Sequence, residues 1–307
     1  MVPFKHDVPE GFNSPIILPR GPEQSSQWQD ANRSWWESHP MRYDWKDKIS
    51  SEECTQEFFE EIDHRFFSIV REFMPWKRVP FDPLIDFDSL REKDALEIGV
   101  GVGSHARLIA QFARSFTGID ITDYAIRSTS ERMRLAGIHA RILRMDAEHM
   151  EFDDNIFDFV WTWGVIHHSS NTRRILQEIH RVLRPGGQAI TMVYHRSFWN
   201  YYLVGALLHG VLQGDLLRTR SVHKTVQRWV DGAFARFYSI PDWRDLVSEF
   251  FCVDRILVFG SKSEIVPLPG GKIKQATMAL IPNGLSRFLT NQCKLGGFLV
   301  SVLKKSV

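Results

Sequence analysis

The stretch Glu97-Ile98-Gly99-Val100-Gly101-Val102-Gly103-Ser104 decides the fold of this chain. Its glycines stand at alternate positions, between a short apolar run and a segment with helical spacing. Glycine lacks a Cβ atom, so its backbone turns tightly and lets a ligand approach closely. The free N–H groups at the start of the following helix suit a carboxylate or a phosphate. The stretch therefore predicts a strand, a ligand-binding turn and a helix, in that order.

The same alternation of short apolar runs and helical segments continues up to residue 195. Strands are predicted at residues 95–98, 116–121, 140–145, 157–163 and 188–194. Helices are predicted at residues 104–116, 122–137 and 171–183, the second of them capped by Thr122 and stopped by Gly137. Alternation with short connections requires parallel strands joined by right-handed crossovers. The predicted fold class is therefore α/β, with a doubly wound, Rossmann-like and mostly parallel sheet.

The region before this sheet, residues 1–90, is rich in aromatic side chains and is predicted to be a helical arm and cap. In it, Ser50 followed by Glu53 has the pattern of a capping box, which predicts that a helix begins there. Apolar residues then recur at helical spacing over residues 58–73. The sheet-forming domain is predicted to occupy residues 91–307.

Two insertions interrupt that domain after the fifth strand. Residues 196–249 are predicted to be helical, with Ser239 as the N-cap of the last helix. Residues 261–297 contain prolines and glycines and separate two further strands, expected at 253–259 and 298–303. We expect these strands to extend one edge of the sheet and the insertions to cover a pocket.

The composition is that of a globular protein, with 307 residues, 43% apolar residues, 24% charged residues and a formal net charge of +1. This balance indicates no basic face, so no nucleic-acid partner is expected. The three cysteines lie far apart and fit a reducing, cytoplasmic location. The start of the chain lacks the apolar core of a signal peptide. The longest apolar stretch, residues 198–212, falls short of the ~20 residues of a transmembrane helix. It is interpreted as a buried or pocket-lining helix, with peripheral membrane contact as the alternative.

Acidic residues follow the next two predicted strands. Asp120 ends the second strand and Asp146 follows the third, so both are expected at the carboxyl edge of the sheet, where such folds bind ligands. A carboxylate at the first position accepts hydrogen bonds from a ribose diol, and one at the second receives the exocyclic amine of adenine. The spacing of Gly101, Gly103 and Ala106 also satisfies a relaxed dinucleotide fingerprint, so a nicotinamide cofactor is an alternative. The additional Gly99 argues against that alternative.

At these residues the chain resembles the class I S-adenosylmethionine-dependent methyltransferases, particularly the branch related to ubiquinone/menaquinone-biosynthesis enzymes. The likeness spans about residues 94–195 and is carried by the segments 95–106, 118–120, 146–147, 152–158, 163–168 and 175–187. It implies a seven-stranded sheet with helical cap insertions and S-adenosylmethionine as the cofactor.

The resemblance also implies roles for particular residues. The glycine loop would hold the amino-acid end of the cofactor, Asp120 the ribose, and Asp146 with the Ala147 amide the adenine. The Trp163-Gly164 turn would lie beside the methionine part. The cofactor-binding candidates are Glu97, Gly99, Gly101, Gly103, Asp120, Ile121, Asp146, Ala147, Trp163 and Gly164.

Candidate catalytic residues are His167, Tyr194 and His195, which follow the fourth strand or end the fifth. A histidine there would take a proton from the acceptor, since imidazole exchanges protons near neutral pH; the alternative is that His167 and His168 cap the next turn. Trp36, Tyr43 and His168 are candidates for contact with the substrate or for a cap over the site. No metal site is expected, because adjacent histidine side chains diverge and no carboxylate or cysteine completes a ligand set.

The sequence therefore predicts methyl transfer to a small, apolar or amphipathic acceptor. A catalytically silent S-adenosylmethionine-binding module is a second hypothesis, and a nicotinamide-dependent oxidoreductase is a third. The acceptor, the methylated atom and the oligomeric state are left open.

Overall fold

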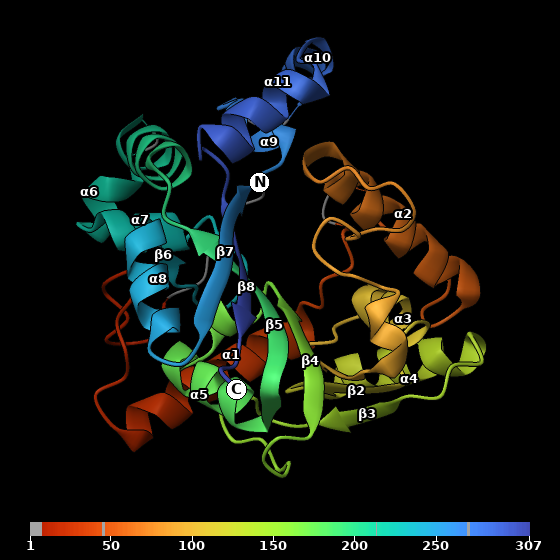
Figure 1. Cartoon of the computed structure of the whole chain (residues 1–307). Helices are drawn as coiled ribbons and strands as arrows, with labels where there is room; N and C mark the ends of the chain where they lie inside the picture. The colour runs from red at the N-terminus through yellow and green to blue at the C-terminus, as the bar shows by residue number, and fades with distance from the viewer. Residues whose placement is uncertain (1–7, 45–46, 213, 269–270) are drawn as a thin grey trace.

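The computed structural model describes residues 8–44, 47–212, 214–268 and 271–307. One mixed sheet lies at its centre (Figure 1). Its strands among the described residues are β1 (Asp94–Ile98), β2 (Ser115–Asp120), β3 (Arg141–Arg144), β4 (Phe157–Trp163), β5 (Leu183–His195), β6 (Phe237–Tyr238), β7 (Cys252–Phe259) and β8 (Phe298–Lys304). Their order is β3-β2-β1-β4-β5-β8-β7, with β6 pairing beside the end of β5. Only β8 runs antiparallel to its neighbours β5 and β7. The predicted doubly wound, mostly parallel sheet is confirmed.

Helices cover both faces of the sheet. The α-helices are α1 (Pro22–Ser38), α2 (Gln56–Phe73), α3 (Ser104–Ala110), α4 (Asp123–Leu135), α5 (Thr172–Val182), α6 (Asp215–Thr219), α7 (Val222–Gln227), α8 (Ile240–Ser248), α9 (Lys262–Ile265), α10 (Lys272–Leu280) and α11 (Asn283–Arg287). The 3-10 helices are η1 (Ser89–Glu92) and η2 (Ile166–His168), and the π-helices are η3 (Phe198–Leu212) and η4 (Phe288–Gln292). Apolar side chains of α2, α3 and α4 pack on one face, and those of α5 and α8 pack on the other.

Local capping sets several boundaries as expected. The Thr122 side chain accepts a hydrogen bond from the Ala125 N–H at the start of α4, and Gly137 has a left-handed φ of 64° just after its end. Ser239 forms a reciprocal capping box with Asp242 at the start of α8.

Four predictions about the secondary-structure elements are wrong. The Ser50/Glu53 pattern starts no helix, because Glu53 pairs with Arg42 and Thr55 caps α2 instead. The helix expected at 104–116 ends at Ala110, since β2 already begins at Ser115. The fifth strand starts at Leu183 rather than residue 188, because Leu183 pairs with Phe157 across a register shift. Residues 196–249 are not helical throughout, because Phe237 and Tyr238 form β6.

The carboxyl edge of the parallel strands carries nearly all of the additional structure. Helix η3 follows the end of β5, and the segment from α9 to η4 precedes β8, whose first residue pairs with Tyr194 near the end of β5. Helix η3 and the segment from α9 to η4 therefore project from this edge, toward the top of Figure 1. Among the described residues, none of the helices combines the length and the apolar character that crossing a bilayer requires.

One buried cation joins three segments at this edge. Arg236 has no exposed surface, and its backbone N–H donates to the His167 carbonyl oxygen (2.9 Å). Its guanidinium donates to the carbonyl oxygens of Ile17 (3.0 Å), Ser169 and Ser170 (2.5 Å). The rings of Phe12, Trp28 and Phe234 surround it at 5.5–5.9 Å. Arg236 thus ties the N-terminal arm to the turn after η2.

Replacing Arg236 by Met should destabilise the protein by about 3–5 kcal/mol, because three buried carbonyl oxygens would lose their donor. Chemical denaturation monitored by circular dichroism measures this loss. The exposed Arg91→Met variant should change stability by less than about 0.5 kcal/mol. Equal stabilities of the two variants would contradict the structural role assigned to Arg236.

Candidate functional site

The glycine turn between β1 and α3 has a left-handed backbone at all three of its alternate glycines. The φ angles of Gly99, Gly101 and Gly103 are 79°, 53° and 82°. A Cβ atom at Gly99 would lie 2.2 Å from a methyl group of Val165, so the turn packs directly against the segment that follows β4. A Cβ atom at Gly101 would meet no atom within 4 Å. The backbone of Gly101 therefore borders open space in which a ligand can lie.

Asp120, at the end of β2, holds this turn in place. Its Oδ2 accepts the Gly101 N–H (3.1 Å), and its Oδ1 accepts both the N–H (3.0 Å) and the hydroxyl (2.8 Å) of Thr122. Burial raises the pKa of Asp120, and these hydrogen bonds, together with one from the Ile121 N–H, oppose the increase. The contact with Gly101 was not predicted from the sequence.

Glu97 lies beneath the turn at the end of β1. Its side chain is buried, and its Oε2 has no hydrogen-bond partner among the described residues. Burial and the nearby Asp120 raise the pKa of Glu97 well above its usual value. His105 Nδ1 lies 3.7 Å from Glu97 Oε1, but burial and Arg132 lower the pKa of His105 to about 3. His105 is therefore neutral near pH 7, so the two side chains do not form an ion pair.

Helix α1 crosses the carboxyl edge and contacts the second acidic position. Gln29 donates to Asp146 Oδ1 (2.9 Å) and accepts the Ser170 N–H (3.1 Å). Asn32, one turn further along, is buried and its Oδ1 has no partner among the described residues. Burial raises the pKa of Asp146. Gln29 was not identified from the sequence, since a glutamine on a polar helix gives no local signal of a partner 117 residues away.

The C-terminal end of α1 contacts the segments that follow β2 and β4. Glu37 accepts the N–H groups of Asp123 (2.8 Å) and Tyr124 (3.1 Å) at the start of α4. The Trp36 ring stands edge-on to the His168 ring, with 5.0 Å between centroids. Helix α1 therefore spans the edge from the end of β4 to the helix after β2.

A cavity of about 920 Å³ opens between α1 and the ends of β2 and β3. Ile121, Met145 and Asp146 line it from the sheet, and Ser25 and Gln29 line it from α1. The Ala147 side chain instead packs against the core on the α5 face. The cavity thus brings two of the predicted cofactor residues, Ile121 and Asp146, to one wall.

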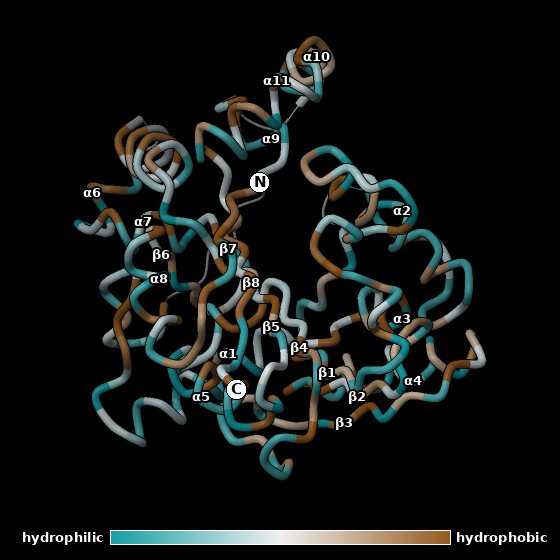
Figure 2. Tube along the Cα trace, in the orientation of Figure 1, coloured by the Kyte–Doolittle hydropathy of each residue, from teal (hydrophilic) through white to brown (hydrophobic). Residues whose placement is uncertain are grey.

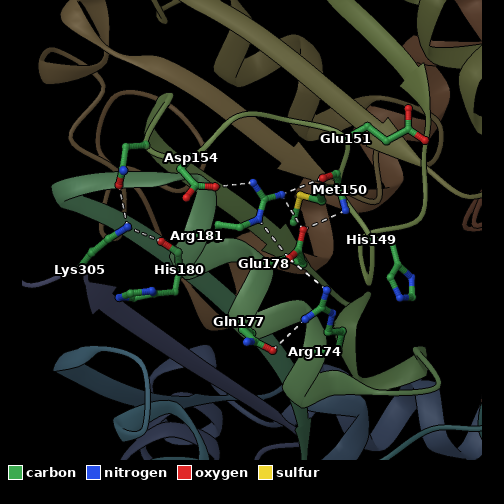
Figure 3. Close-up of a pocket in the computed structure, with 11 residues that line it drawn as sticks. His149, Met150, Glu151, Asp154, Arg174, Gln177, Glu178, His180, Arg181 and Lys305 are labelled. Carbon is green, nitrogen blue, oxygen red and sulfur yellow. Dashed lines mark hydrogen bonds and ion pairs between the residues drawn. The ribbon is translucent and has the colours of Figure 1, made fainter.

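A second hollow of about 690 Å³ lies beside α5 and contains none of the predicted site residues (Figure 3). The charges in it are paired within the protein. Arg181 donates to Asp154 (2.8 Å) and to Glu178 (2.7 Å), and Lys305 donates to Asn155 (2.8 Å). We therefore locate the functional site at the carboxyl edge and not in this hollow.

Two of the predicted catalytic residues, His167 and Tyr194, lie together with His168. The ring of His167 lies 4.0 Å from the ring of Tyr194 and 4.1 Å from the ring of His168, measured between centroids. The Tyr194 hydroxyl donates to Asp231 Oδ1 (2.6 Å). The negative charge of Asp231 also contributes to raising the pKa of Tyr43, whose main cause is burial. Asp231 thus belongs to the candidate site, although it was not predicted from the sequence.

The histidines of this cluster are neutral. Burial, with the nearby His168 and Arg236, lowers the pKa of His167 well below its usual value, although the Met192 carbonyl acts in the opposite direction. Neither ring nitrogen of His167 makes a hydrogen bond of normal geometry with a described residue. The interpretation that His167 caps the next turn therefore fails, and Asn171 caps α5. Burial also raises the pKa of Tyr194, so its phenol stays protonated.

His168 and His195 are both held by backbone carbonyl groups. His168 Nδ1 is 2.8 Å from the Phe234 oxygen, and its Nε2 is buried without a partner among the described residues. His195 Nδ1 is 2.8 Å from the oxygen of Gly296, on the segment before β8. His195 therefore links the strand end to the second insertion and is not part of the His167 cluster.

The Trp163-Gly164 turn completes this edge. The Trp163 ring stacks on that of Trp161 at 5.3 Å and meets the Phe81 ring edge-on at 5.0 Å. The Gly164 N–H donates to the Met192 oxygen (3.3 Å). These contacts fix the turn between the glycine loop and the histidine cluster.

The expectation that the adjacent histidines diverge is wrong, because the rings of His167 and His168 lie close together. The described part of the chain nevertheless contains no group of three or more side chains suited to hold a metal ion.

The sequence of the sheet matches known enzymes. Residues 96–191 match the family model described as a methyltransferase domain. A phthiotriol/phenolphthiotriol dimycocerosates methyltransferase of Mycobacterium tuberculosis is 38% identical over 97 residues, which are 31% of this chain and 35% of that enzyme. A sterol 24-C-methyltransferase of Neurospora crassa is 37% identical over 101 residues, which are 32% of this chain and 26% of that enzyme. The match therefore spans about a third or less of each of these relatives.

Solved structures share the fold over more of the chain. The cyclase SpnF has a TM-score of 0.50 and 15% identity, over 96% of this chain and 99% of that one. The MccD protein has a TM-score of 0.50 and 16% identity, over 74% of this chain and 96% of that one. These identities show the fold alone. The family match shows that the chain contains a methyltransferase domain over residues 96–191. The relatives do not single out the ubiquinone/menaquinone branch.

The lowered pKa of His105 predicts how stability depends on pH. Below about pH 6.5 the unfolded chain protonates this histidine but the folded protein does not, so acid favours unfolding. Between pH 6.5 and 5, the parent should lose up to about 1.4 kcal/mol per pH unit more than a His105→Gln variant. Urea unfolding at a series of pH values measures the difference. Parallel pH profiles for the two proteins would contradict the lowered pKa.

Proposed function

We propose that this chain transfers a methyl group from S-adenosylmethionine to a small, apolar or amphipathic acceptor. One observation carries the proposal: Gly99 of the glycine turn packs against Val165, just before the helical turn that holds His167 and His168. A cofactor at the glycine turn and an acceptor beside Tyr194 would then meet at the same edge of the sheet. We further propose that residues 1–90 form an arm and cap for a methyltransferase unit at residues 91–307.

The residues present fit the cofactor. Gly101 borders open space, Asp120 lies against the Gly101 N–H, and the cavity beside Asp146 opens onto both α1 and the sheet. We propose that the glycine turn holds the amino-acid end of S-adenosylmethionine, that Asp120 and Ile121 hold the ribose, and that Asp146 and the Ala147 amide hold the adenine. The Trp163-Gly164 turn would then flank the methionine part. Trp36 and Tyr43 would help to close the site.

The names of two relatives, a dimycocerosate methyltransferase and a sterol methyltransferase, support an apolar or amphipathic acceptor. A third relative is named as a phosphoethanolamine methyltransferase. Because the relatives act on different kinds of acceptor, their names do not decide which atom of the acceptor receives the methyl group. We also propose a cytoplasmic location, supported by three free cysteines.

S-adenosylmethionine supplies an already activated methyl group, so the protein has mainly to position the acceptor and manage its proton. We propose that the neutral His167 imidazole, whose nitrogens make no hydrogen bond of normal geometry with a described residue, accepts the proton of the acceptor. Tyr194, whose hydroxyl proton is donated to Asp231, would orient the acceptor by accepting a hydrogen bond through its phenol oxygen.

A silent S-adenosylmethionine-binding module is the second candidate. The likeness to SpnF covers nearly the whole chain, and that protein is named as a cyclase, so the fold alone does not establish methyl transfer. Release of S-adenosylhomocysteine in the presence of a panel of lipid, sterol and phenolic acceptors separates the two candidates. The nicotinamide alternative finds no support among the relatives.

Two glycine substitutions test the cofactor site with a matched control. Gly101→Ala and Gly137→Ala both place a methyl group in open space at a left-handed position, so each should cost about 1–2 kcal/mol of stability. Only Gly101→Ala should weaken S-adenosylmethionine binding, by at least about tenfold, because its methyl group enters the space assigned to the ligand. Isothermal titration calorimetry measures the binding. Unchanged affinity in Gly101→Ala would remove the glycine turn from the site.

His167→Ala tests the proposed base. It should lower kcat by roughly 10²–10⁴-fold and leave the affinity for S-adenosylmethionine nearly unchanged. Because burial lowers the pKa of His167, the acid limb of the parent's kcat profile should lie below pH 6.5 and be absent from the variant. Initial rates of S-adenosylhomocysteine release from pH 5 to 8 measure both effects. A fully active His167→Ala protein would exclude this histidine as the base.

A further inference from the structure

The second insertion presents only positive charge to its surroundings. Between residues 262 and 297 the sequence contains five lysines and arginines and a single acidic residue, Glu264. The Glu264 carboxylate points inward, where it accepts hydrogen bonds from the Ser261 N–H (2.7 Å), the Gly297 N–H (2.6 Å) and the Asn200 side-chain amide (2.9 Å). The exposed charges of this insertion, such as Lys272 and Lys294, are therefore cations.

Large apolar side chains stand beside these cations. On α10, Ile273 is 76% and Leu280 is 83% exposed, and on α11 and η4, Leu285 and Phe288 are at least half exposed. Exposed apolar side chains in such a group commonly mark an interaction surface. Figure 2 shows the apolar colouring of α10 at the outer end of the insertion.

Helix η3 adds a second set of exposed apolar side chains. The sequence from 198 to 214 contains no charged residue. Its exposed large side chains, spaced four or five residues apart along one side of the helix, are Phe198, Tyr202, Leu207 and Val211.

The two insertions are joined at their base. The Asn200 side-chain amide donates to the Glu264 carboxylate and to the backbone oxygen of Leu295 (3.0 Å). The Trp199 indole N–H donates to the backbone oxygen of Glu264 (2.9 Å). Helix η3 and the α9–η4 segment both project beyond the carboxyl edge of the sheet (Figures 1 and 2). We call the exposed apolar and basic residues of these helices the cap face.

We propose that the cap face docks onto the surface of an anionic phospholipid bilayer. Apolar side chains beside lysines fit an interface in which acyl chains lie beneath negative headgroups. A second copy of the chain fits less well, because its own cap face carries the same positive charge. The cap face lies at the edge that holds His167 and Tyr194, so docking would bring that edge to the bilayer. The proposal does not depend on methyl transfer, and lipid binding is measured separately from activity.

Vesicle flotation of the full chain tests the proposal. The protein should bind vesicles of phosphatidylcholine that contain about one third phosphatidylglycerol, and should bind phosphatidylcholine alone less well. Binding should weaken when the salt concentration rises, because salt screens the lysines. The double variant Ile273→Ser/Leu280→Ser should bind the anionic vesicles roughly tenfold more weakly, since two apolar contacts are lost. The double variant Lys272→Gln/Lys294→Gln should reduce binding to the anionic vesicles toward the level seen with phosphatidylcholine alone.

Leu135→Ser provides the matched control. Leu135 is 42% exposed at the end of α4, on the opposite edge of the sheet, so this variant should bind vesicles as the parent does. Absence of vesicle binding by the parent, or equal loss in the control, would overturn the proposal. Self-association of the parent that the Ile273→Ser/Leu280→Ser variant abolishes, without vesicle binding, would assign the cap face to a second copy instead.

Discussion

The carboxyl edge of this protein depends on the burial of a single cation. Arg236 is completely enclosed, and a buried guanidinium is tolerated only where hydrogen-bond acceptors take up its donors. Those oxygens come from Ile17 and from the Ser169-Ser170 turn. Because the Arg236 N–H also binds the His167 carbonyl, the same residue fixes the backbone of the histidine cluster. The arm and the proposed active site are therefore assembled together.

Burial also determines the protonation states of the titratable side chains at the carboxyl edge of the sheet. Desolvation raises the pKa values of Glu97 and Tyr194 and lowers those of His105 and His167. His105, His167 and Tyr194 are consequently neutral near pH 7, and the same burial favours the protonated form of Glu97. The charge of Asp231, by contrast, is held against the Tyr194 hydroxyl.

The contacts that hold the acidic residues at the strand ends could not be predicted from the sequence. The position of Asp120 follows from strand alternation, but its hydrogen bond to Gly101 depends on the exact path of the turn. Gln29 and Asp231 are ordinary polar residues in the sequence, and they become site residues only because α1 and the segment before β6 fold back over the sheet. Their partners are far away in the chain, so local patterns carry no information about them.

The sequence by itself determined the sheet, because hydrophobic periodicity and the glycines of the 97–104 stretch act over only a few residues. It also placed Asp120 and Asp146 at one edge, since parallel strands end on the same side. Tertiary structure alone decided that the His167 nitrogens make no hydrogen bond of normal geometry with a described residue, that His195 faces the second insertion, and that the Ser50/Glu53 pattern starts no helix. Each of these outcomes depends on side chains from distant parts of the chain. Burial against those side chains determines the cost of desolvation and the available hydrogen-bond partners, and neither can be read from neighbouring residues in the sequence.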